Sequence, residues 1–262
     1  MMLVRSLLFA VTFTATTVMM SLLILPGLVL PYRFVLVYKQ VWLKVVLWQI
    51  QTVIAIDFEE RGRANIPAGP VIFAAKHQSA WDTLGPSLLH PEMVYVLKRE
   101  LTWIPAWGWY LIRVGMIPID RSKGPKALKG LVHRAREAIA KGRSVLIFPQ
   151  GTRTAPGAKR PYLPGVAALY AGLDVPVVPV ALNSGLFWPR RQLRKWPGTI
   201  TLEYLEPISP GLDRKSFMKE LADRIEPATA RLESEARVRF PWLPPLQDEE
   251  KRADTAKATA KT

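Results

Sequence analysis

The sequence predicts an α/β protein, a single domain with a central mixed sheet flanked by helices, preceded by an N-terminal membrane-embedded helical segment. Short apolar runs typical of buried strands alternate with segments whose apolar residues fall at helical spacing. Polar residues follow several of these runs, which is where α/β sheets place their functional sites. Near its start the chain also has 27 consecutive residues, Ser6 to Tyr32, without a charged side chain.

The composition limits the size and the partners of this protein. The chain has 262 residues, 49% of them hydrophobic, which is enough for one large domain or two small ones. Its formal net charge of +15 indicates an anionic partner, either nucleic acid or an anionic lipid surface. Cysteine is absent, which excludes disulfides and a cysteine nucleophile. The three histidines lack the spacing of a zinc site, so no metal is expected, and His90 and His133 are expected at the surface.

The uncharged N-terminal stretch indicates a membrane segment. A helix of 27 residues extends about 40 Å, more than a hydrocarbon core of about 30 Å, although Pro26 and Pro31 favour a kink or an end near Leu25 to Leu30. The stretch is too long for a signal peptide and lacks a clear cleavage site. Basic residues among Tyr and Trp follow it, which suits a headgroup layer. One span with an interfacial helix and a helical hairpin within one leaflet both fit, and a buried helix pair in a soluble core is the third possibility.

The chain is expected to divide into a membrane-anchoring helical segment (1–50), an α/β domain (51–246) and a charged, disordered tail (247–262). The expected strands are Val53–Phe58, Val71–Ala75, Met93–Leu97, Met116–Ile119, Ser144–Phe148, Val175–Leu182 and Thr199–Leu205. The expected helices are Thr83–Leu89, a helix that Ser122 caps and Gly142 closes, and Asp213–Val238.

Two segments rich in tryptophan allow more than one interpretation. The rings of Trp103–Tyr110 could pack in the core, line an apolar channel or rest on a bilayer. The segment Trp188–Trp196, basic residues bracketed by tryptophans, could contact membrane phosphates or form a solvated loop.

The turn after the expected strand Val71–Ala75 contains the pair that indicates chemistry. His77 and Asp82 are five residues apart, so they would point in different directions on one continuous helix but can meet across a turn. A carboxylate bonded to one imidazole nitrogen leaves the other free to accept a proton, which makes a general base. The alternative is structural, because Ser79-x-x-Asp82 is also a capping-box pattern.

Two further strand ends carry groups suited to phosphate. Arg121 and Arg153 provide forked cations that can bind a phosphate through two parallel hydrogen bonds. Gly151 allows the backbone to approach a ligand closely, and Thr152 can add a hydroxyl contact. A base, a phosphate site and a membrane segment together indicate a lipid phosphate whose hydroxyl is deprotonated.

Four ordered motifs resemble those of the glycerolipid acyltransferases, over about residues 50–210. They are His77-x4-Asp82, Gly115–Arg121, Phe148–Arg153 and Val177–Ser184. The resemblance implies transfer of an acyl group from acyl-CoA or acyl carrier protein to the sn-2 hydroxyl of lysophosphatidic acid, without a cofactor. It implies that His77 takes the hydroxyl proton, that Asp82 orients His77, and that Arg121 and Arg153, with Lys98, hold the acceptor phosphate.

One position departs from the family pattern. Gln150 stands where the third motif commonly has glutamate, so hydrogen bonding remains but the charge is lost, and the choice of acceptor could differ. An alternative acceptor is another lyso-lipid, such as a lyso-ornithine lipid. A membrane-tethered nucleic-acid-binding protein would also explain the charge, but no binding module is visible and no nucleic-acid partner is expected. A non-catalytic membrane scaffold would need no His/Asp pair. Because thioester donors are cytosolic, the resemblance implies a membrane protein whose active site faces the cytoplasm.

Overall fold

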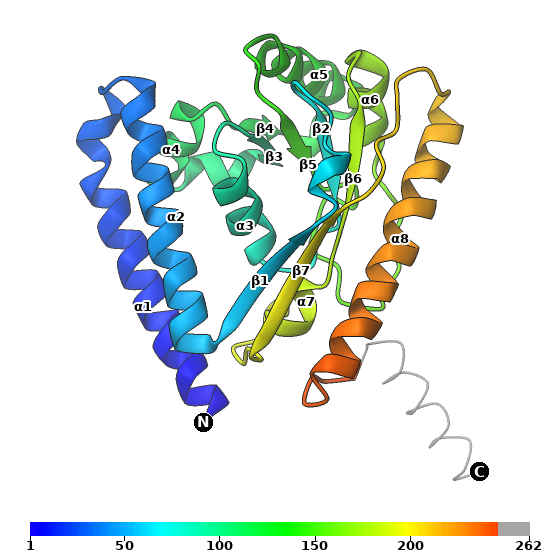
Figure 1. Ribbon diagram of the computed structural model, residues 1–262. Helices are drawn as coiled ribbons and strands as arrows, with labels where there is room; N and C mark the ends of the chain where they lie inside the picture. Colours follow the sequence, from blue (N-terminus) through cyan, green and yellow to red (C-terminus); the bar gives the residue numbers. More distant parts are fainter. Residues whose placement is uncertain (246–262) are drawn as a thin grey trace.

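A seven-stranded mixed sheet lies at the centre of the computed structural model, which describes residues 1–245 (Figure 1). The strands are β1 (Ile56–Arg61), β2 (Ile72–Ala75), β3 (Val94–Lys98), β4 (Ile117–Ile119), β5 (Val145–Ile147), β6 (Val177–Leu182) and β7 (Gly198–Tyr204). Their order in the sheet is β1-β7-β6-β2-β5-β3-β4. The strands β6, β2, β5, β3 and β4 run parallel, whereas β7 is antiparallel to β6 and parallel to β1. The expected α/β fold with a mixed sheet is confirmed.

Helices cover both faces of this sheet. The α-helices are α1 (Met2–Leu23), α2 (Tyr32–Ile54), α3 (Trp81–Leu89), α4 (Trp107–Arg113), α5 (Gly124–Ala140), α6 (Pro164–Gly172), α7 (Ser184–Phe187) and α8 (Arg214–Arg239). Short 3₁₀ helices are η1 (Leu25–Leu28), η2 (Arg63–Asn65), η3 (Arg99–Trp103) and η4 (Arg121–Lys123). Helices α5, α6 and α8 pack on one face, and α2 and α3 lie on the other (Figure 1).

Strand β2 shows how the sheet joins two hydrophobic clusters. Ile72 and Ala74 belong to the cluster that includes α5, α6 and α8, while Phe73 and Ala75 belong to the cluster that includes α2 and α3. Successive side chains of a strand point to opposite faces, so a strand covered on both sides must be apolar at every position. All four residues of β2 are buried, and the turn that follows them is therefore held firmly at its start.

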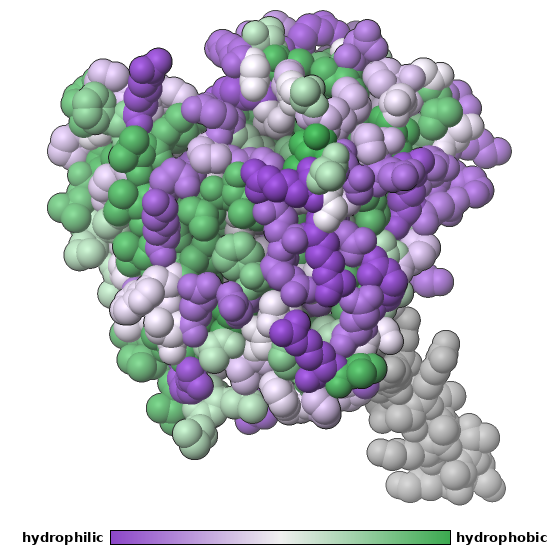
Figure 2. All heavy atoms as spheres, in the orientation of Figure 1, coloured by the Kyte–Doolittle hydropathy of each residue, from purple (hydrophilic) through white to green (hydrophobic). Residues whose placement is uncertain are grey.

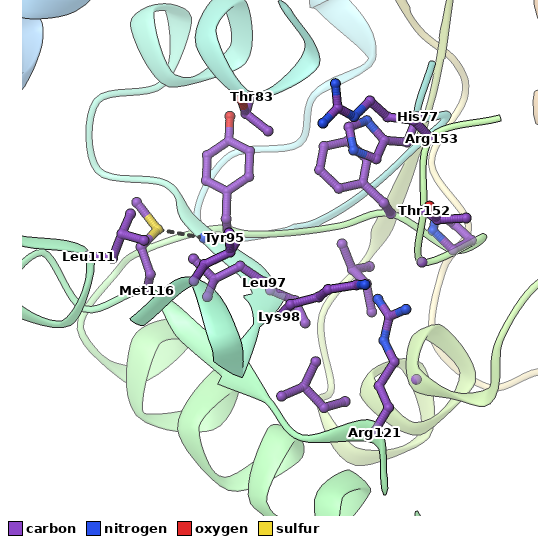
Figure 3. Close-up of a pocket in the computed structure, with 18 of the residues that line it drawn as sticks. His77, Thr83, Tyr95, Leu97, Lys98, Leu111, Met116, Arg121, Thr152 and Arg153 are labelled. Carbon is purple, nitrogen blue, oxygen red and sulfur yellow. Dashed lines mark hydrogen bonds between the residues drawn. The ribbon is translucent and has the colours of Figure 1, made fainter. Parts of the chain in front are cut away.

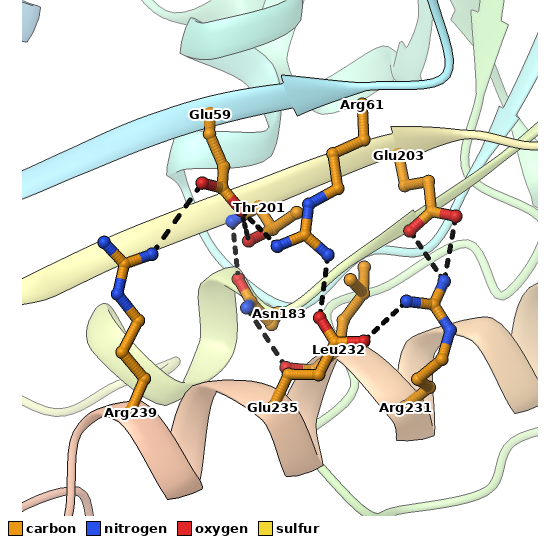
Figure 4. A network of polar contacts seen from close by, with 9 residues as sticks. All are labelled: Glu59, Arg61, Asn183, Thr201, Glu203, Arg231, Leu232, Glu235 and Arg239. Carbon is orange, nitrogen blue, oxygen red and sulfur yellow. Dashed lines mark hydrogen bonds and ion pairs between the residues drawn. The ribbon is translucent and has the colours of Figure 1, made fainter.

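Polar contacts attach α8 to the strands β1 and β7 (Figure 4). Arg61 pairs with Glu59 and Glu235 at 2.6 and 2.7 Å, and Arg231 pairs with Glu203 at 2.7 Å. These pairs are partly exposed, so each contributes only about 0–1 kcal/mol. The buried side chain of Asn183 accepts a hydrogen bond from Thr201 N and donates one to Leu232 O, which adds a link that water does not weaken.

The helices α1 and α2 form a hairpin along one side of the domain. Helix α2 buries ten of its residues, whereas α1 buries only Ser6 and Phe9 among the described residues. Helix α1 is apolar and long enough to cross a membrane, with a mean hydropathy of 1.8. Apolar residues gather over α1 and α2, and hydrophilic residues gather over α8 (Figure 2). The apolar N-terminal helix indicates membrane association.

The structure corrects three details of the predicted elements. Ser122 lies in η4 and does not cap α5, which begins at Gly124. Val53 and Ile54 end α2, and β1 begins only at Ile56, after Ala55 adopts a left-handed φ of 52°. Periodicity did not distinguish the apolar end of the helix from a strand. His90 is not a surface residue, because its ring is partly buried and hydrogen-bonds the Tyr204 hydroxyl at 2.7 Å. Burial lowers the pKa of His90. The expected tail lies outside the described residues.

Candidate active site

The expected site residues lie at the carboxyl edge of the parallel strands. His77 follows β2, Lys98 ends β3, Arg121 follows β4, and Thr152 and Arg153 follow β5. Neighbouring parallel strands end at the same edge, so four segments that are distant in sequence deliver their polar residues to one place. These five residues and Gly151 line a common cavity of about 620 Å³, whereas Asp82 lies behind His77.

His77 and Asp82 meet across the turn between β2 and α3. The His77 Nδ1 atom lies 2.8 Å from the Asp82 Oδ2 atom. The imidazole ring stacks on Phe148, with the ring centres 3.8 Å apart and 15° between the planes. A carboxylate at Nδ1 requires the proton on that nitrogen, so Nε2 is left as the acceptor. His77 lines the cavity, so this arrangement can remove a proton from a bound hydroxyl group.

The Asp82 side chain also has the structural role that its spacing from Ser79 indicated. Its Oδ2 atom accepts the backbone N–H groups of Gln78 and Ser79 at 2.7 and 2.8 Å. Its Oδ1 atom accepts the hydroxyl group of Ser184, from the end of β6. Asp82 is fully buried, and these four donors fix its position. The capping and the catalytic interpretations therefore describe one carboxylate that holds the turn and His77 together.

The loop after β5 is fastened to the same turn. Thr154 N donates to His77 O at 2.7 Å, and Leu163 N donates to Pro149 O at 2.7 Å. Gly151 has a φ of 65°, and a Cβ atom at this position would lie 2.8 Å from Arg121 Nη1. Glycine is therefore needed twice, for the left-handed backbone and for the approach of the Arg121 guanidinium group.

Two groups of cations face the cavity at separate places (Figure 3). The Lys98 and Arg121 side chains extend toward each other, whereas Arg153 lies beside His77. Burial lowers the pKa of Arg121, and the charge of Arg160 adds to this effect, while Glu100 opposes it. Burial likewise lowers the pKa of Arg153, although both guanidinium groups keep their charge at neutral pH. Among the described residues, no carboxylate is hydrogen-bonded to either guanidinium group. Both groups line the cavity and are therefore suited to an anionic ligand.

The cavity continues from these polar groups into an apolar part. Its apolar lining comes mainly from the helices α2, α3 and α4, from β3 and from the segment before β4, and it includes Trp42, Leu84, Tyr95, Trp107, Leu111 and Met116. A cavity that is polar at one end and apolar at the other is suited to an amphipathic ligand.

Gln150 does not face this cavity. The side chain is buried, it is absent from the cavity lining, and neither its amide nitrogen nor its amide oxygen has a hydrogen-bond partner among the described residues. The position at which the sequence departs from the family pattern is therefore placed away from any ligand in the cavity.

Sequence reasoning missed three residues of the site. Arg190 lines the cavity and donates to Arg153 O at 3.1 Å, Ser184 donates to Asp82, and Glu233 on α8 accepts from Gln78 at 2.6 Å. Arg190 belongs to the basic segment Trp188–Trp196, but the sequence did not show that its side chain points into the cavity. Ser184 ends the fourth sequence motif, but its contact with Asp82 spans 102 positions and that of Glu233 with Gln78 spans 155, so no local pattern indicates these partners.

Comparison with known proteins agrees with this geometry. Residues 57–183 match the family model described as Acyltransferase. The chain is 41% identical over 169 residues to the 1-acyl-sn-glycerol-3-phosphate acyltransferase of Pseudomonas aeruginosa. The aligned region covers 64% of this chain and 65% of that protein. It is 28% identical over 198 residues to the protein of the same name from Cocos nucifera, with 74% and 63% covered. The chain thus spans about 65% of the length of these curated relatives.

A solved structure supports the fold independently. The crystal structure of the 1-acyl-sn-glycerophosphate acyltransferase from Thermotoga maritima superposes with a TM-score of 0.72 at 20% identity, covering 88% of this chain and 99% of that one. At this identity the likeness establishes the common fold. The sequence match includes the His77–Asp82 turn and the loop that ends in Arg153. Residues 57–183, which contain the His77–Asp82 turn and the proposed site around it, are therefore similar to the acyltransferase family.

Proposed function

We propose that this protein is an enzyme that transfers a fatty acyl group from a thioester, acyl-CoA or acyl carrier protein, to the sn-2 hydroxyl group of lysophosphatidic acid, forming phosphatidic acid. The observation that carries the proposal is the His77–Asp82 pair, 2.8 Å apart, at a cavity that also contains cations and a long apolar part. The names of the matched relatives support the same acceptor.

The proposed reaction needs no covalent acyl-enzyme. His77 Nε2 accepts the proton of the acceptor hydroxyl group while that oxygen attacks the thioester carbonyl carbon. The tetrahedral intermediate then collapses, the C–S bond breaks, and the imidazolium returns its proton to the leaving thiolate. Asp82 holds the ring in one tautomer and stabilises the imidazolium, as a buried carboxylate at Nδ1 does in hydrolase triads.

The cations near His77 are proposed to hold the acceptor. Arg121 and Lys98 extend to one place, and Arg153 lies beside the imidazole, so a phosphate bound between these two groups of cations would leave the glycerol part near Nε2 (Figure 3). Guanidinium groups bind phosphate through two parallel hydrogen bonds and so fix its orientation as well as its charge. This fixed orientation would bring the free hydroxyl group to His77 on each binding event.

We further propose that the protein lies on the cytoplasmic face of a membrane, where its lipid acceptor and soluble donors meet. The contacts of α1 favour a helical hairpin in one leaflet over a full crossing. Arg5 donates to Val53 O at 2.6 Å, and Ser6 accepts from Lys195 N at 2.9 Å, so the domain flanks the start of α1. At the other end of α1, Ile24 packs with Tyr110 of the domain. If α1 crossed the bilayer, the parts of the domain that contact its two ends would lie on opposite sides, and charged groups between them, such as Lys195, would lie within the bilayer.

A panel of acceptors and donors tests the proposal. Purified protein in detergent is given a labelled acyl thioester, as CoA or carrier protein, with lysophosphatidic acid, lysophosphatidylcholine or a lyso-ornithine lipid. We expect turnover with lysophosphatidic acid, and its loss in the His77→Ala variant. Turnover only with an acceptor that lacks a phosphate monoester would refute the acceptor, and no turnover with any pair would refute the activity.

A further inference from the structure

The strongest feature that the proposed reaction does not use is an apolar surface on η3 and α4. Its members are Leu101, Trp103, Ile104, Trp109 and Ile112, and we call it the η3–α4 patch. The exposed fractions of Trp103, Trp109 and Ile112 are 65%, 53% and 58%. Contiguous exposed apolar groups of this size mark a binding surface more often than chance.

The backbone of the patch is closely packed and hydrogen-bonded. Gly108 of α4 lies against η3 so closely that a Cβ atom there would be 2.2 Å from Thr102 O. Gly108 N also donates to Ile104 O at 2.7 Å, and Ala106 adopts a φ of 61°, which alanine rarely does. Surrounding contacts must hold this backbone, so Trp103 and Trp109 are presented to solvent in fixed positions.

The sequence of the patch suits lipid better than a protein partner. No charged residue occurs between Glu100 and Arg113, and α4 carries only Arg113, at its last position, as a charged residue, although one of its faces is exposed. Helices that are apolar all round are found in cores or in membranes. The Arg99 guanidinium group lies 5.7 Å from the centre of the Trp103 ring, and tryptophan beside arginine is typical of the headgroup layer.

The patch is continuous with the apolar surface of the α1–α2 hairpin. Tyr110 and Val114 pack with Ile24 and Val35 at the turn of the hairpin, and Arg113 donates to Leu30 O at 2.6 Å. Figure 1 shows α4 beside the upper end of α2. Because α1 exposes apolar side chains along its length, a bilayer that covers the hairpin turn would reach the patch as well.

The same segment forms one wall of the cavity. Leu101 belongs to the patch and also lines the cavity, while Trp107 and Leu111 line it from the inner side of α4. We infer that the η3–α4 patch is a second membrane contact, seated in the lipid surface at the rim of the cavity, through which the hydrocarbon chain of a lipid passes sideways from the bilayer. This passage rests on the proposed function, whereas the lipid contact does not.

The absence of cysteine allows a direct test of the lipid contact. Single cysteines replace Trp103 or Trp109 and carry an environment-sensitive NBD fluorophore, in full-length protein reconstituted into vesicles of phosphatidylcholine and phosphatidylglycerol. Val11→Cys on exposed α1 is the positive reference, and Lys215→Cys at the start of α8 is the negative one. We expect blue-shifted emission and quenching by brominated acyl chains at 103 and 109, as at 11, and neither effect at 215.

Two results would overturn the inference. If the labels at 103 and 109 show no blue shift and no quenching, as at 215, while the label at 11 is quenched, the membrane contact is excluded. Emission that shifts with protein concentration in detergent without lipid would instead identify a second copy of the chain as the occupant. Neither result depends on turnover, so the patch and the proposed function can fail separately.

A kinetic experiment tests the sideways passage. The double variant Trp103→Ser, Trp109→Ser should raise the KM for lyso-lipid in vesicles by about tenfold, because two large rings leave the lipid, and should not change the KM for a short-chain acceptor dissolved as monomers. Leu212→Ser, at an exposed apolar residue before α8, should change neither. An equal rise for both acceptors would place the effect inside the cavity and contradict the inference.

Discussion

Glu233 on α8 accepts a hydrogen bond from the Gln78 side chain at 2.6 Å, directly behind the turn that carries His77. Its other carboxylate oxygen accepts Gly157 N at 3.1 Å. One buried side chain thus joins the turn after β2 to the loop after β5, the two segments that carry the proposed base and Arg153. The long helix α8 does not line the cavity, and it contacts the turn and the loop of the site through this carboxylate.

The first prediction concerns pH and stability. Burial raises the pKa of Glu233 from 4.5 to about 7, Glu226 adds to this, and Lys76 and the two hydrogen bonds oppose it. Between these values the folded state binds more protons than the unfolded state, so stability falls as pH rises and is level above about 7. The expected loss is ~3 kcal/mol. The unfolding free energy of wild type relative to that of Glu233→Gln, measured by denaturant titration in detergent, should fall by about this amount as pH rises from about 4.5 to 7. A difference that is constant across this range would contradict the assignment.

The second prediction concerns the proposed base. His77→Ala should lower kcat by at least ~10²-fold, because general-base contributions are of this size or larger. Asp82→Asn should lower it as well, since the amide no longer holds the required tautomer and charge. Ser184→Ala removes only one of four donors to Asp82 and should have a much smaller effect. Steady-state turnover with melting temperatures as a folding control decides this, and equal losses in all three variants would indicate a structural role only.

The sequence predicted the parts of the site that depend on neighbouring residues. The run Val71–Ala75 is apolar at each position and ends at His77 and Asp82, so strand, turn and pair could all be read locally. Gly151 and Arg153 follow β5 in the same way. The carboxyl edge of a parallel sheet then brings these segments together by a general rule of the fold.

Residues whose role depends on packing were not predictable in this way. Trp107 lines the cavity while Trp103 and Trp109 are exposed, although the three lie within one aromatic segment. The channel interpretation fits Trp107, whereas the bilayer interpretation of Trp103 and Trp109 stays a prediction that their exposure allows. Glu233 is similar, because a carboxylate on a long charged helix is usually solvated, and only the packing of α8 on the sheet buries it.

The third prediction separates charge from geometry at the proposed phosphate site. Arg121→Lys and Arg153→Lys should each raise the acceptor KM by about tenfold or more, because a point charge does not replace a two-pronged hydrogen-bond donor. Arg136→Lys on α5 is the matched control, since Arg136 is exposed and donates to Gly172 O outside the cavity. The donor KM should change less than the acceptor KM. Unchanged acceptor KM values in both cavity variants would argue against this phosphate site.

The fourth prediction compares two glycines with left-handed backbone. Gly151 and Gly142 have φ values of 65° and 73°, but only at Gly151 would a Cβ atom meet neighbours, Leu163 and Arg121. Alanine at either position should cost roughly 1–2 kcal/mol of stability through its backbone conformation. Only Gly151→Ala should also raise the acceptor KM, because the added carbon displaces the Arg121 guanidinium group. Thermal unfolding and acceptor kinetics of the pair test this, and a normal acceptor KM in Gly151→Ala would contradict it.

The last prediction concerns Gln150, where the sequence left the choice of acceptor open. Its amide is buried without a hydrogen-bond partner among the described residues and does not line the cavity. Gln150→Met should therefore keep the acceptor preference and raise stability by ~1 kcal/mol, because an unsatisfied polar group is removed from the interior at nearly constant volume. Gln150→Glu should be less stable than wild type, and increasingly so as pH rises, because burial raises the pKa of a carboxyl group and penalises its charged form. Acceptor competition assays and unfolding at several pH values measure both effects. A switch of acceptor in either variant would show that this buried position controls the cavity from behind.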